Sequence, residues 1–282
     1  MRLLLAAARD IARRPKRSFI YFFGRFHLVR KINKLIVSFF GTQIKIPSPK
    51  EAVEINTPDF ESSIEQLRNT ALLQNIILRE PVLQEILNLV ETSYSSDAAT
   101  GRSISIIEAK QHNLDNNKNK ILMLNHKSPS LDRCVQKIAC SPLLVDIATR
   151  YLGRIKAIET RVQTSLATHA PTEYRERCHQ TVMFHYDVHA LGFLYAFFYL
   201  SDCNEMSGAH EMIRCSHKSK PWKFLISTAR RSDEDIYTYY PGKSIIISGN
   251  KGTGFVEDTS CFHRALPPIS GDRLALQIRY SA

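Results

Sequence analysis

The sequence lacks an apolar stretch long enough to cross a membrane. Its longest near-apolar run, residues 190–200, has 11 residues, whereas a transmembrane helix needs about 20. Low-complexity tracts are missing too, and 44% of the 282 residues are hydrophobic, which excludes a disordered or fibrous chain. The chain is long enough for one large core, or for a core with a modest second domain.

Signals for secretion and for disulfide bonding are also missing. The first ten residues hold only a short apolar run, with no small-residue cleavage site before the basic cluster at residues 13–17. The six cysteines form no CxxC pair, and a chain of this size does not need disulfides to fold. We therefore expect reduced thiols and a cytoplasmic location, peripheral to a membrane if the N-terminal segment binds one.

Acidic residues are nearly absent from the first 50 residues, which contain twelve Lys and Arg but only one acid, Asp10. The other 232 residues carry 26 basic and 26 acidic side chains, so the net charge of +11 belongs to this segment. Within residues 1–46, bulky apolar groups alternate with cations, as in segments that lie on anionic membranes. A helix packed on the body with a solvated basic face, or a targeting peptide, fits as well. We do not expect nucleic acid as the partner.

The composition divides the chain into three parts. Two prolines at residues 47 and 49 close a basic amphipathic arm, residues 1–50. Residues 51–110 form a predicted helical region, because apolar side chains recur at helical spacing through residues 58–93. Residues 111–282 form the third part, and the sequence shows no internal repeat.

The third part begins with a predicted helix over residues 130–152, which ends at Gly153. Short segments rich in β-branched and aromatic residues follow, separated by turn residues. They are residues 155–167, 180–189, 193–201, 223–228, 244–248, 253–259 and 273–280. This pattern predicts a β-sandwich or barrel packed against a helical front half.

Three polar residues alternate along one of these predicted strands. His185, Asp187 and His189 share a face of the strand, and His263 lies far downstream. Two imidazoles and one carboxylate on one side of a metal leave open the positions that non-haem Fe(II) chemistry needs. Taken alone, His185 and Asp187 favour a satisfied core pair, and the segment that follows His263 shifts the balance toward a metal site. We expect His189 to line a pocket or to serve the structure.

Arg273 follows His263 in another strand-like segment. A guanidinium there can hold one end of a dicarboxylate through two hydrogen bonds while the other end binds the metal. Arg279 faces the same way on a regular strand and is the second candidate. Zinc accepts the same ligands, but hydrolytic zinc sites generally add a carboxylate base as in HExxH, and the sequence contains no such motif.

Five separated motifs resemble, in the same order, those of the phytanoyl-CoA dioxygenase family. They are residues 141–153, 184–187, 193–202, 205–219 and 252–280, and the resemblance covers roughly residues 130–282. Members of this family are Fe(II)- and 2-oxoglutarate-dependent oxygenases. The resemblance implies an α+β protein with a double-stranded β-helix (jelly-roll) core, here residues 111–282, and an N-terminal helical region.

The resemblance also implies roles for individual residues. His185, Asp187 and His263 match the iron ligands, and Arg273 matches the anchor of 2-oxoglutarate. Where related enzymes offer a hydroxyl to this co-substrate, the present chain has an alanine at position 265. Thr181 or Gln163 is then expected to supply the contact, so both are candidate co-substrate residues.

The function implied is hydroxylation of an unactivated C–H bond in a small-molecule or lipid-like substrate, either lipid-linked or a natural product. Asp187 favours hydroxylation over halogenation, because related halogenating enzymes lack this carboxylate. The chain departs from the family pattern at Arg214 and Cys215, which replace a Pro-Gly pair. A zinc-dependent hydrolase and a non-catalytic, membrane-associated β-barrel protein remain the alternatives.

Overall fold

The structure, a computed structural model, describes residues 15–47, 50–56, 59–115 and 119–282. Within these residues, eight strands form a larger antiparallel sheet in the order β1-β2-β9-β6-β11-β5-β4-β3. Their bounds are β1 Val53–Ile55, β2 Leu72–Leu78, β3 Tyr94–Asp97, β4 Met123–Lys127, β5 Ala157–Ser165, β6 Phe193–Tyr199, β9 Thr253–Glu257 and β11 Arg273–Ser281. A smaller antiparallel sheet has the order β10-β7-β8, with β7 His210–Ile213, β8 Ser244–Ile247 and β10 His263–Ala265.

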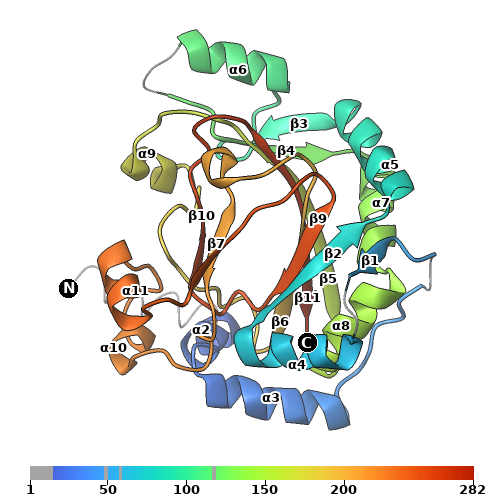
Figure 1. Cartoon of the computed structure of the whole chain (residues 1–282), viewed down its shortest axis with the longest axis vertical. Helices are drawn as coiled ribbons and strands as arrows, with labels where there is room; N and C mark the ends of the chain where they lie inside the picture. The colour runs from blue at the N-terminus through green and yellow to red at the C-terminus, as the bar shows by residue number, and fades with distance from the viewer. Residues whose placement is uncertain (1–14, 48–49, 57–58, 116–118) are drawn as a thin grey trace.

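Helices cover the outer face of the larger sheet (Figure 1). They are α4 Phe60–Thr70, α5 Glu80–Glu91, α7 Pro129–Ala139 and α8 Pro142–Leu152. The remaining helices are α2 Pro15–Phe23, α3 His27–Phe40, α6 Ile106–Asp115, α9 Thr172–Arg177, α10 Trp222–Leu225 and α11 Asp233–Tyr239, with a 3-10 turn at Glu205–Ser207. The two sheets pack on each other through an apolar cluster that is separate from the core under the helices. In this cluster, Met212 and Ile247 of the smaller sheet contact Tyr199 and Phe255 of the larger one.

Strand β11 shows how this layering creates an interior cavity. Alternate side chains of a strand point to opposite faces of the sheet. Leu276, Ile278 and Tyr280 belong to the core under the helices, whereas Arg273 and Arg279 line a cavity on the other face. The predicted jelly-roll core is confirmed, and its inner surface carries the polar residues.

The prediction of helix throughout residues 58–93 is wrong at its centre. Helix α4 ends at Thr70. The next residue, Ala71, has a left-handed backbone (φ 67°), and β2 follows before α5 begins. The register of β2 shifts between Leu73 and Ile76, at a bulge. Because of the bulge, the side chains of Leu73 and Ile76 both point into the apolar core under the helices. A bulge thus leaves buried apolar residues three positions apart, which is also the spacing of a helix.

Three other predicted elements also differ. The helix over residues 130–152 is two helices, because Pro142 lacks the N–H that would continue the first one. Residues 180–189 form only isolated bridges rather than a strand. Residues 223–228 were expected to be a strand but contribute to helix α10. The predicted strands over β5, β6, β8, β9 and β11 are confirmed.

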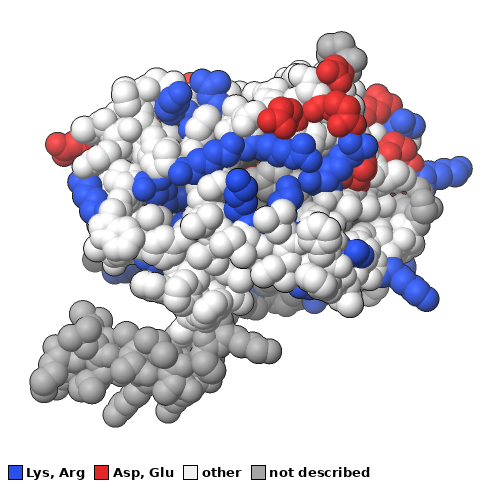
Figure 2. All heavy atoms as spheres, turned by 90° about the horizontal axis from the view of Figure 1, so that it is seen from below, with Lys and Arg blue, Asp and Glu red and all other residues white. Residues whose placement is uncertain are grey.

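The described part of the basic arm packs on the body through polar residues. Arg30 forms an ion pair with Asp258, 2.8 Å apart, and Arg25 donates to the carbonyls of Leu225 and Ser227 at 3.0 and 2.6 Å. The expectation of a solvated basic face is therefore wrong for these two arginines. Figure 2 shows the side of the molecule on which α3 lies, with Lys and Arg in a band across it. The arm's residues 1–14 lie outside the described residues.

Candidate metal centre

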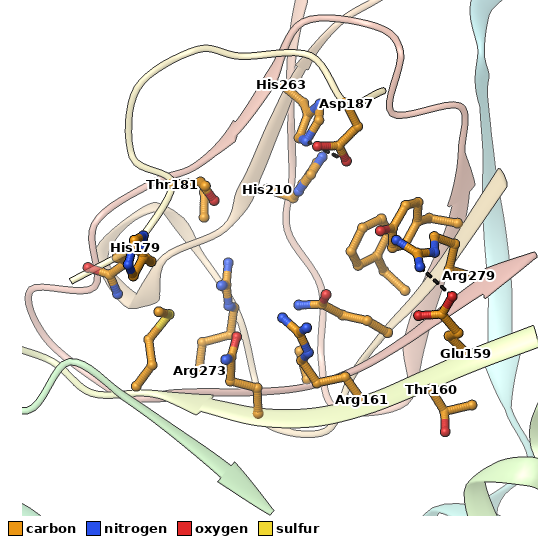
Figure 3. A pocket seen from close by; sticks show the side chains of 18 of the residues that line it. Glu159, Thr160, Arg161, His179, Thr181, Asp187, His210, His263, Arg273 and Arg279 are labelled. Atoms are coloured by element: carbon orange, nitrogen blue, oxygen red, sulfur yellow. Dashed lines mark hydrogen bonds and ion pairs between the residues drawn. The ribbon is translucent and has the colours of Figure 1, made fainter. Parts of the chain in front are cut away.

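Three of the predicted site residues meet at one end of the cavity. His185 and Asp187 lie in the segment between α9 and β6, and His263 begins β10. His185 donates its backbone N–H to the carbonyl of His263 at 3.0 Å and accepts one in return at 2.8 Å. One ligand atom from each of the three side chains lies within 4.8 Å of the others. In Figure 3, Asp187 and His263 point toward each other at the top of the cavity.

Backbone carbonyls fix the orientation of both imidazole rings. Nδ1 of His185 lies 3.0 Å from the carbonyl oxygen of Met183, and Nδ1 of His263 lies 3.0 Å from that of Cys261. When Nδ1 donates its proton there, Nε2 keeps a free lone pair. These Nε2 atoms face the Asp187 carboxylate at 4.0 and 3.8 Å. The geometry therefore presents two nitrogen ligands and one oxygen ligand.

The charge states of these groups also suit a divalent cation. Burial by itself would raise the pKa of Asp187, but His189, His263 and His185 outweigh it and hold this pKa well below its usual range. Burial, together with His185, lowers the pKa of His263 to about 4. At neutral pH the carboxylate is charged and the His263 imidazole is neutral. A metal ion would therefore displace few protons on binding.

His189 lies beside this group. Its Nε2 is 3.3 Å from Oδ2 of Asp187, and its ring lines the cavity. Because this contact is to the carboxylate of a candidate ligand, His189 is placed to orient Asp187. This agrees with its predicted position in the pocket.

The cavity extends from the metal centre toward the larger sheet and has a volume of about 290 Å³. Arg273, Thr181 and Gln163 all line it. Arg273 donates to the carbonyl of Gly208 and, at 3.3 Å, to the hydroxyl of Ser165. Its Nε is buried and has no hydrogen-bond partner in the described part of the chain. Arg273 forms no ion pair within the described residues, so an anionic group in the cavity would be its charged partner.

Two other candidate residues in the cavity, Gln163 and Arg279, differ in how available their side chains are to a ligand. Gln163 donates its amide to Asn125 at 3.0 Å, which leaves its own amide oxygen facing the cavity residues. Arg279, the second candidate anchor, lies on the same face as Arg273 but is paired with Glu159 (Figure 3). The pairing makes Arg279 less available to an anion than Arg273.

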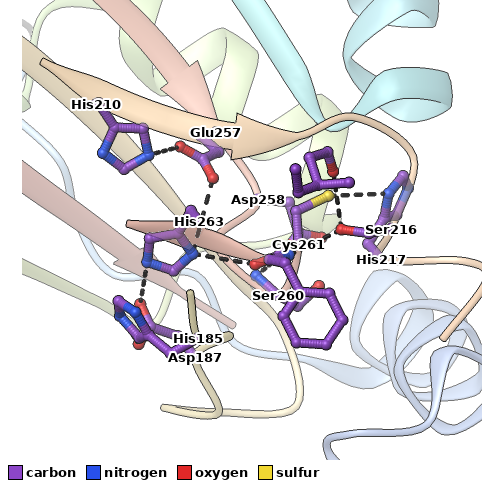
Figure 4. Close-up of polar contacts among 12 residues, drawn as sticks. His185, Asp187, His210, Ser216, His217, Glu257, Asp258, Ser260, Cys261 and His263 are labelled. Atoms are coloured by element: carbon purple, nitrogen blue, oxygen red, sulfur yellow. Dashed lines mark hydrogen bonds and ion pairs between the residues drawn. The ribbon is translucent and has the colours of Figure 1, made fainter. Parts of the chain in front are cut away.

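Sequence reasoning missed a buried pair behind His263. His210 begins β7, and its ring stacks on that of His263 with centroids 5.4 Å apart. Nε2 of His210 lies 2.6 Å from Oε2 of Glu257 (Figure 4). Burial lowers the pKa of His210 to about 3 and raises that of Glu257 to about 8. The pair is therefore neutral at pH 7, with the proton on the carboxyl group.

Two residues of the site that sequence reasoning missed, Glu257 and Arg161, could have been found from the sequence. Glu257 ends a strand whose neighbours are apolar, and an acid in such a position is normally buried only with a partner. Arg161 follows from the alternation of β5, because it lies two residues before Gln163 and lines the same cavity. In Figure 3 the side chain of Arg161 extends from β5 into the cavity, and that of Arg273 extends into it from β11.

No protein-family model and no curated protein matches the chain. Solved structures do match it. SnoN, titled a non-heme alpha ketoglutarate dependent epimerase from nogalamycin biosynthesis, is 14% identical with a TM-score of 0.51, over 78% of this chain and 82% of that one. The chain has the jelly-roll fold of 2-oxoglutarate-dependent oxygenases. At this identity the likeness concerns the fold.

Two further structures are similar to the same degree. HygX from Streptomyces hygroscopicus, with nickel, 2-oxoglutarate and hygromycin B bound, is 11% identical with a TM-score of 0.51, over 79% of this chain and 87% of that one. EvdO2 from Micromonospora carbonacea var. aurantiaca, complexed with 2-oxoglutarate, is 13% identical with a TM-score of 0.51, over 81% and 93%. Membership of the phytanoyl-CoA dioxygenase family stays a prediction.

Proposed function

We propose that this protein is an Fe(II)- and 2-oxoglutarate-dependent dioxygenase. The observation that carries the proposal is the convergence of His185, Asp187 and His263, with their ligand atoms within 4.8 Å of one another. Two imidazoles and one carboxylate on one side of a metal are typical of non-haem iron oxygenases. The similar structures support the proposal, because HygX and EvdO2 hold 2-oxoglutarate in this fold.

The residues of the chain fit both groups. His185 and His263 would bind iron through Nε2, because Nδ1 of each ring faces a backbone carbonyl. Arg273 would hold the far carboxylate of 2-oxoglutarate, because it lines the cavity and, unlike Arg279, forms no ion pair among the described residues. Thr181 and Gln163 would contact the co-substrate from the sides of the cavity. Iron with 2-oxoglutarate supplies the oxidising power from O₂, which amino-acid side chains lack.

The walls of the cavity suggest the kind of substrate. Tyr195, Phe197 and Phe255 line it as a stack, with neighbouring ring centroids 5.4 and 5.0 Å apart. Arg161 adds a cation that forms no ion pair in the described part of the chain. We propose hydroxylation of an unactivated C–H bond in a molecule with an apolar body and an anionic group, such as a lipid-linked metabolite or a natural product. The rings would hold the body and Arg161 the anion.

Anaerobic titration with Fe(II) and 2-oxoglutarate tests the class. We expect a weak visible metal-to-ligand charge-transfer band in the native protein and in Arg279→Leu, the matched control, but not in Arg273→Leu. His185→Ala and His263→Ala should lose the iron itself. With O₂ and a panel of anionic amphiphiles, the native protein should release succinate.

Two outcomes would contradict the proposal. Retention of zinc in preference to iron, with turnover indifferent to O₂, would indicate a hydrolase. Failure to bind any divalent metal would indicate a non-catalytic protein that keeps only the fold. Loss of the band in Arg279→Leu but not in Arg273→Leu would keep the class and transfer the anchor to Arg279.

A further inference from the structure

Helix α3 is amphipathic, but the usual arrangement, with the apolar face buried and the polar face exposed, is reversed. Its buried residues are Arg30 and Val37. Its exposed large apolar residues are Leu28, Ile32, Leu35, Ile36, Phe39 and Phe40, of which the last two are 75% and 84% exposed. Their spacing places these six on one face of a helix. The helix therefore turns an apolar face outward and a polar face toward the body.

A buried ion pair imposes this orientation. Arg30 donates two hydrogen bonds to Asp258, at 2.9 and 2.8 Å, and its guanidinium lies 4.9 Å from the ring centre of Phe193. The hydroxyl of Tyr151 donates to the same carboxylate at 2.7 Å. Rotating α3 to bury its apolar face would leave Asp258 charged and unpaired inside the protein, which is strongly unfavourable.

Helix α2 extends the apolar face. Phe19 and Phe22 are about half exposed, and Arg25 at the end of the helix is held by the carbonyls of Leu225 and Ser227. As in α3, the arginine is inside and the aromatic rings are outside. Two consecutive helices thus expose apolar side chains far beyond the scattered ones expected on a soluble surface.

Positive charge accompanies this face. Lys31 of α3 is exposed, as is Lys45 five residues after the helix ends, and the sequence contains no Asp or Glu from residue 11 to residue 50. Figure 2 looks onto this side of the molecule, where blue side chains form a band across white surface and the red ones gather toward one end. An apolar face edged by cations is complementary to an anionic, amphiphilic surface.

We propose that α2 and α3 form a docking surface for the anionic leaflet of a lipid bilayer. The apolar side chains would enter the boundary between headgroups and acyl chains, and the lysines would contact the headgroups. A second copy of this chain is disfavoured, because it would bring two such cationic segments together. No described helix is long and apolar enough to cross a bilayer, so the contact is peripheral. The docking does not depend on the proposed catalytic function.

Co-sedimentation of the full chain with vesicles tests this directly. Phosphatidylcholine vesicles are compared with equimolar phosphatidylcholine–phosphatidylglycerol vesicles at low and high salt. We expect binding to the anionic vesicles to exceed binding to the neutral ones by at least about tenfold and to weaken with salt. Lys31→Glu combined with Lys45→Glu should abolish the preference, because each lysine near a membrane surface contributes about fivefold.

A matched pair of variants separates apolar docking from general stickiness. Phe39→Ser with Phe40→Ser should weaken vesicle binding at least about tenfold. Ile107→Ser with Leu114→Ser on α6, where both side chains are 77% exposed, should leave it unchanged. All four side chains are solvent-exposed, so the variants should fold, as circular dichroism would verify.

Three results would overturn the proposal. They are absence of binding to anionic vesicles, equal binding to both kinds of vesicle, and equal loss in the α6 control. Light scattering tests the other occupant: a dimer that Phe39→Ser with Phe40→Ser converts to a monomer would assign this face to a second copy instead.

Discussion

Nε2 of His210 lies 2.6 Å from Oε2 of Glu257, and Oε1 of the same carboxyl group faces Nδ1 of His263 at 3.9 Å. The three side chains come from β7, β9 and β10, and His210 and Glu257 are buried. The pair thus supports the ring of a proposed metal ligand from behind. Groups in such positions commonly change metal affinity when they are removed.

Two substitutions of Glu257 distinguish the effect of its shape on metal affinity from the effect of its charge. Glu257→Ala should lower the affinity for Fe(II) or Ni(II) about tenfold, because the ring of His263 loses support. Glu257→Gln should stay near the native affinity, because burial raises the pKa of the native carboxyl to about 8 and an amide is a neutral group of nearly the same shape. Calorimetric metal titration checks both. Equal losses in the two variants would show that a charged carboxylate is needed.

Arg161 should select the substrate without holding the co-substrate. Arg161→Gln should reduce the ratio of turnover for an anionic amphiphile to that for its neutral amide about tenfold, since one charged hydrogen bond contributes roughly 1.5 kcal/mol. The 2-oxoglutarate affinity should not change. Succinate release measures both, and Lys156→Gln, an exposed change on the same strand edge outside the cavity, is the control. A loss of 2-oxoglutarate binding in Arg161→Gln would assign the anchor to Arg161.

The ion pair between Arg30 and Asp258 should be costly to break from one side. Arg30→Met leaves a buried carboxylate without its partner and should lower the free energy of unfolding by about 3–5 kcal/mol. Arg30→Met with Asp258→Leu should recover most of that loss, because neither charge then remains buried. Denaturant unfolding of the two variants and of Asp258→Leu gives the coupling. If the double variant is no more stable than Arg30→Met, the pair is not the origin of the effect.

Acid should destabilise the metal-free protein through its buried histidines. Burial lowers the pKa of His217 to about 4, so the unfolded chain binds the proton first as the pH falls. The stability that neutral His217 contributes is complete above about pH 6.5 and is lost as the pH falls to about 4, on the order of 2–3 kcal/mol. Thermal unfolding between pH 7 and pH 4 should show a smaller decline in His217→Gln. An unchanged slope would contradict this assignment.

Much of the candidate site could be predicted from local spacing. The separation of His185 and Asp187, and the alternation that puts Arg273 and Arg279 on one face of β11, are properties of short segments. The bulged strand β2 shows the limit of such reasoning, because its apolar spacing also fits a helix. Its neighbour β9 decides the matter by supplying hydrogen bonds across the sheet.

By itself, the sequence predicted the candidate metal ligands and a candidate cationic anchor, and it determined the apolar strand faces and the concentration of positive charge in the first 50 residues. Only the tertiary structure decided that His210 and Glu257 lie together behind His263, that Arg161 enters the cavity, and that α3 turns its apolar face outward. These outcomes depend on contacts between residues far apart in the chain. The free energy of burying a charged group or a ring depends on the partner that it contacts in the folded protein. No local sequence pattern specifies that partner.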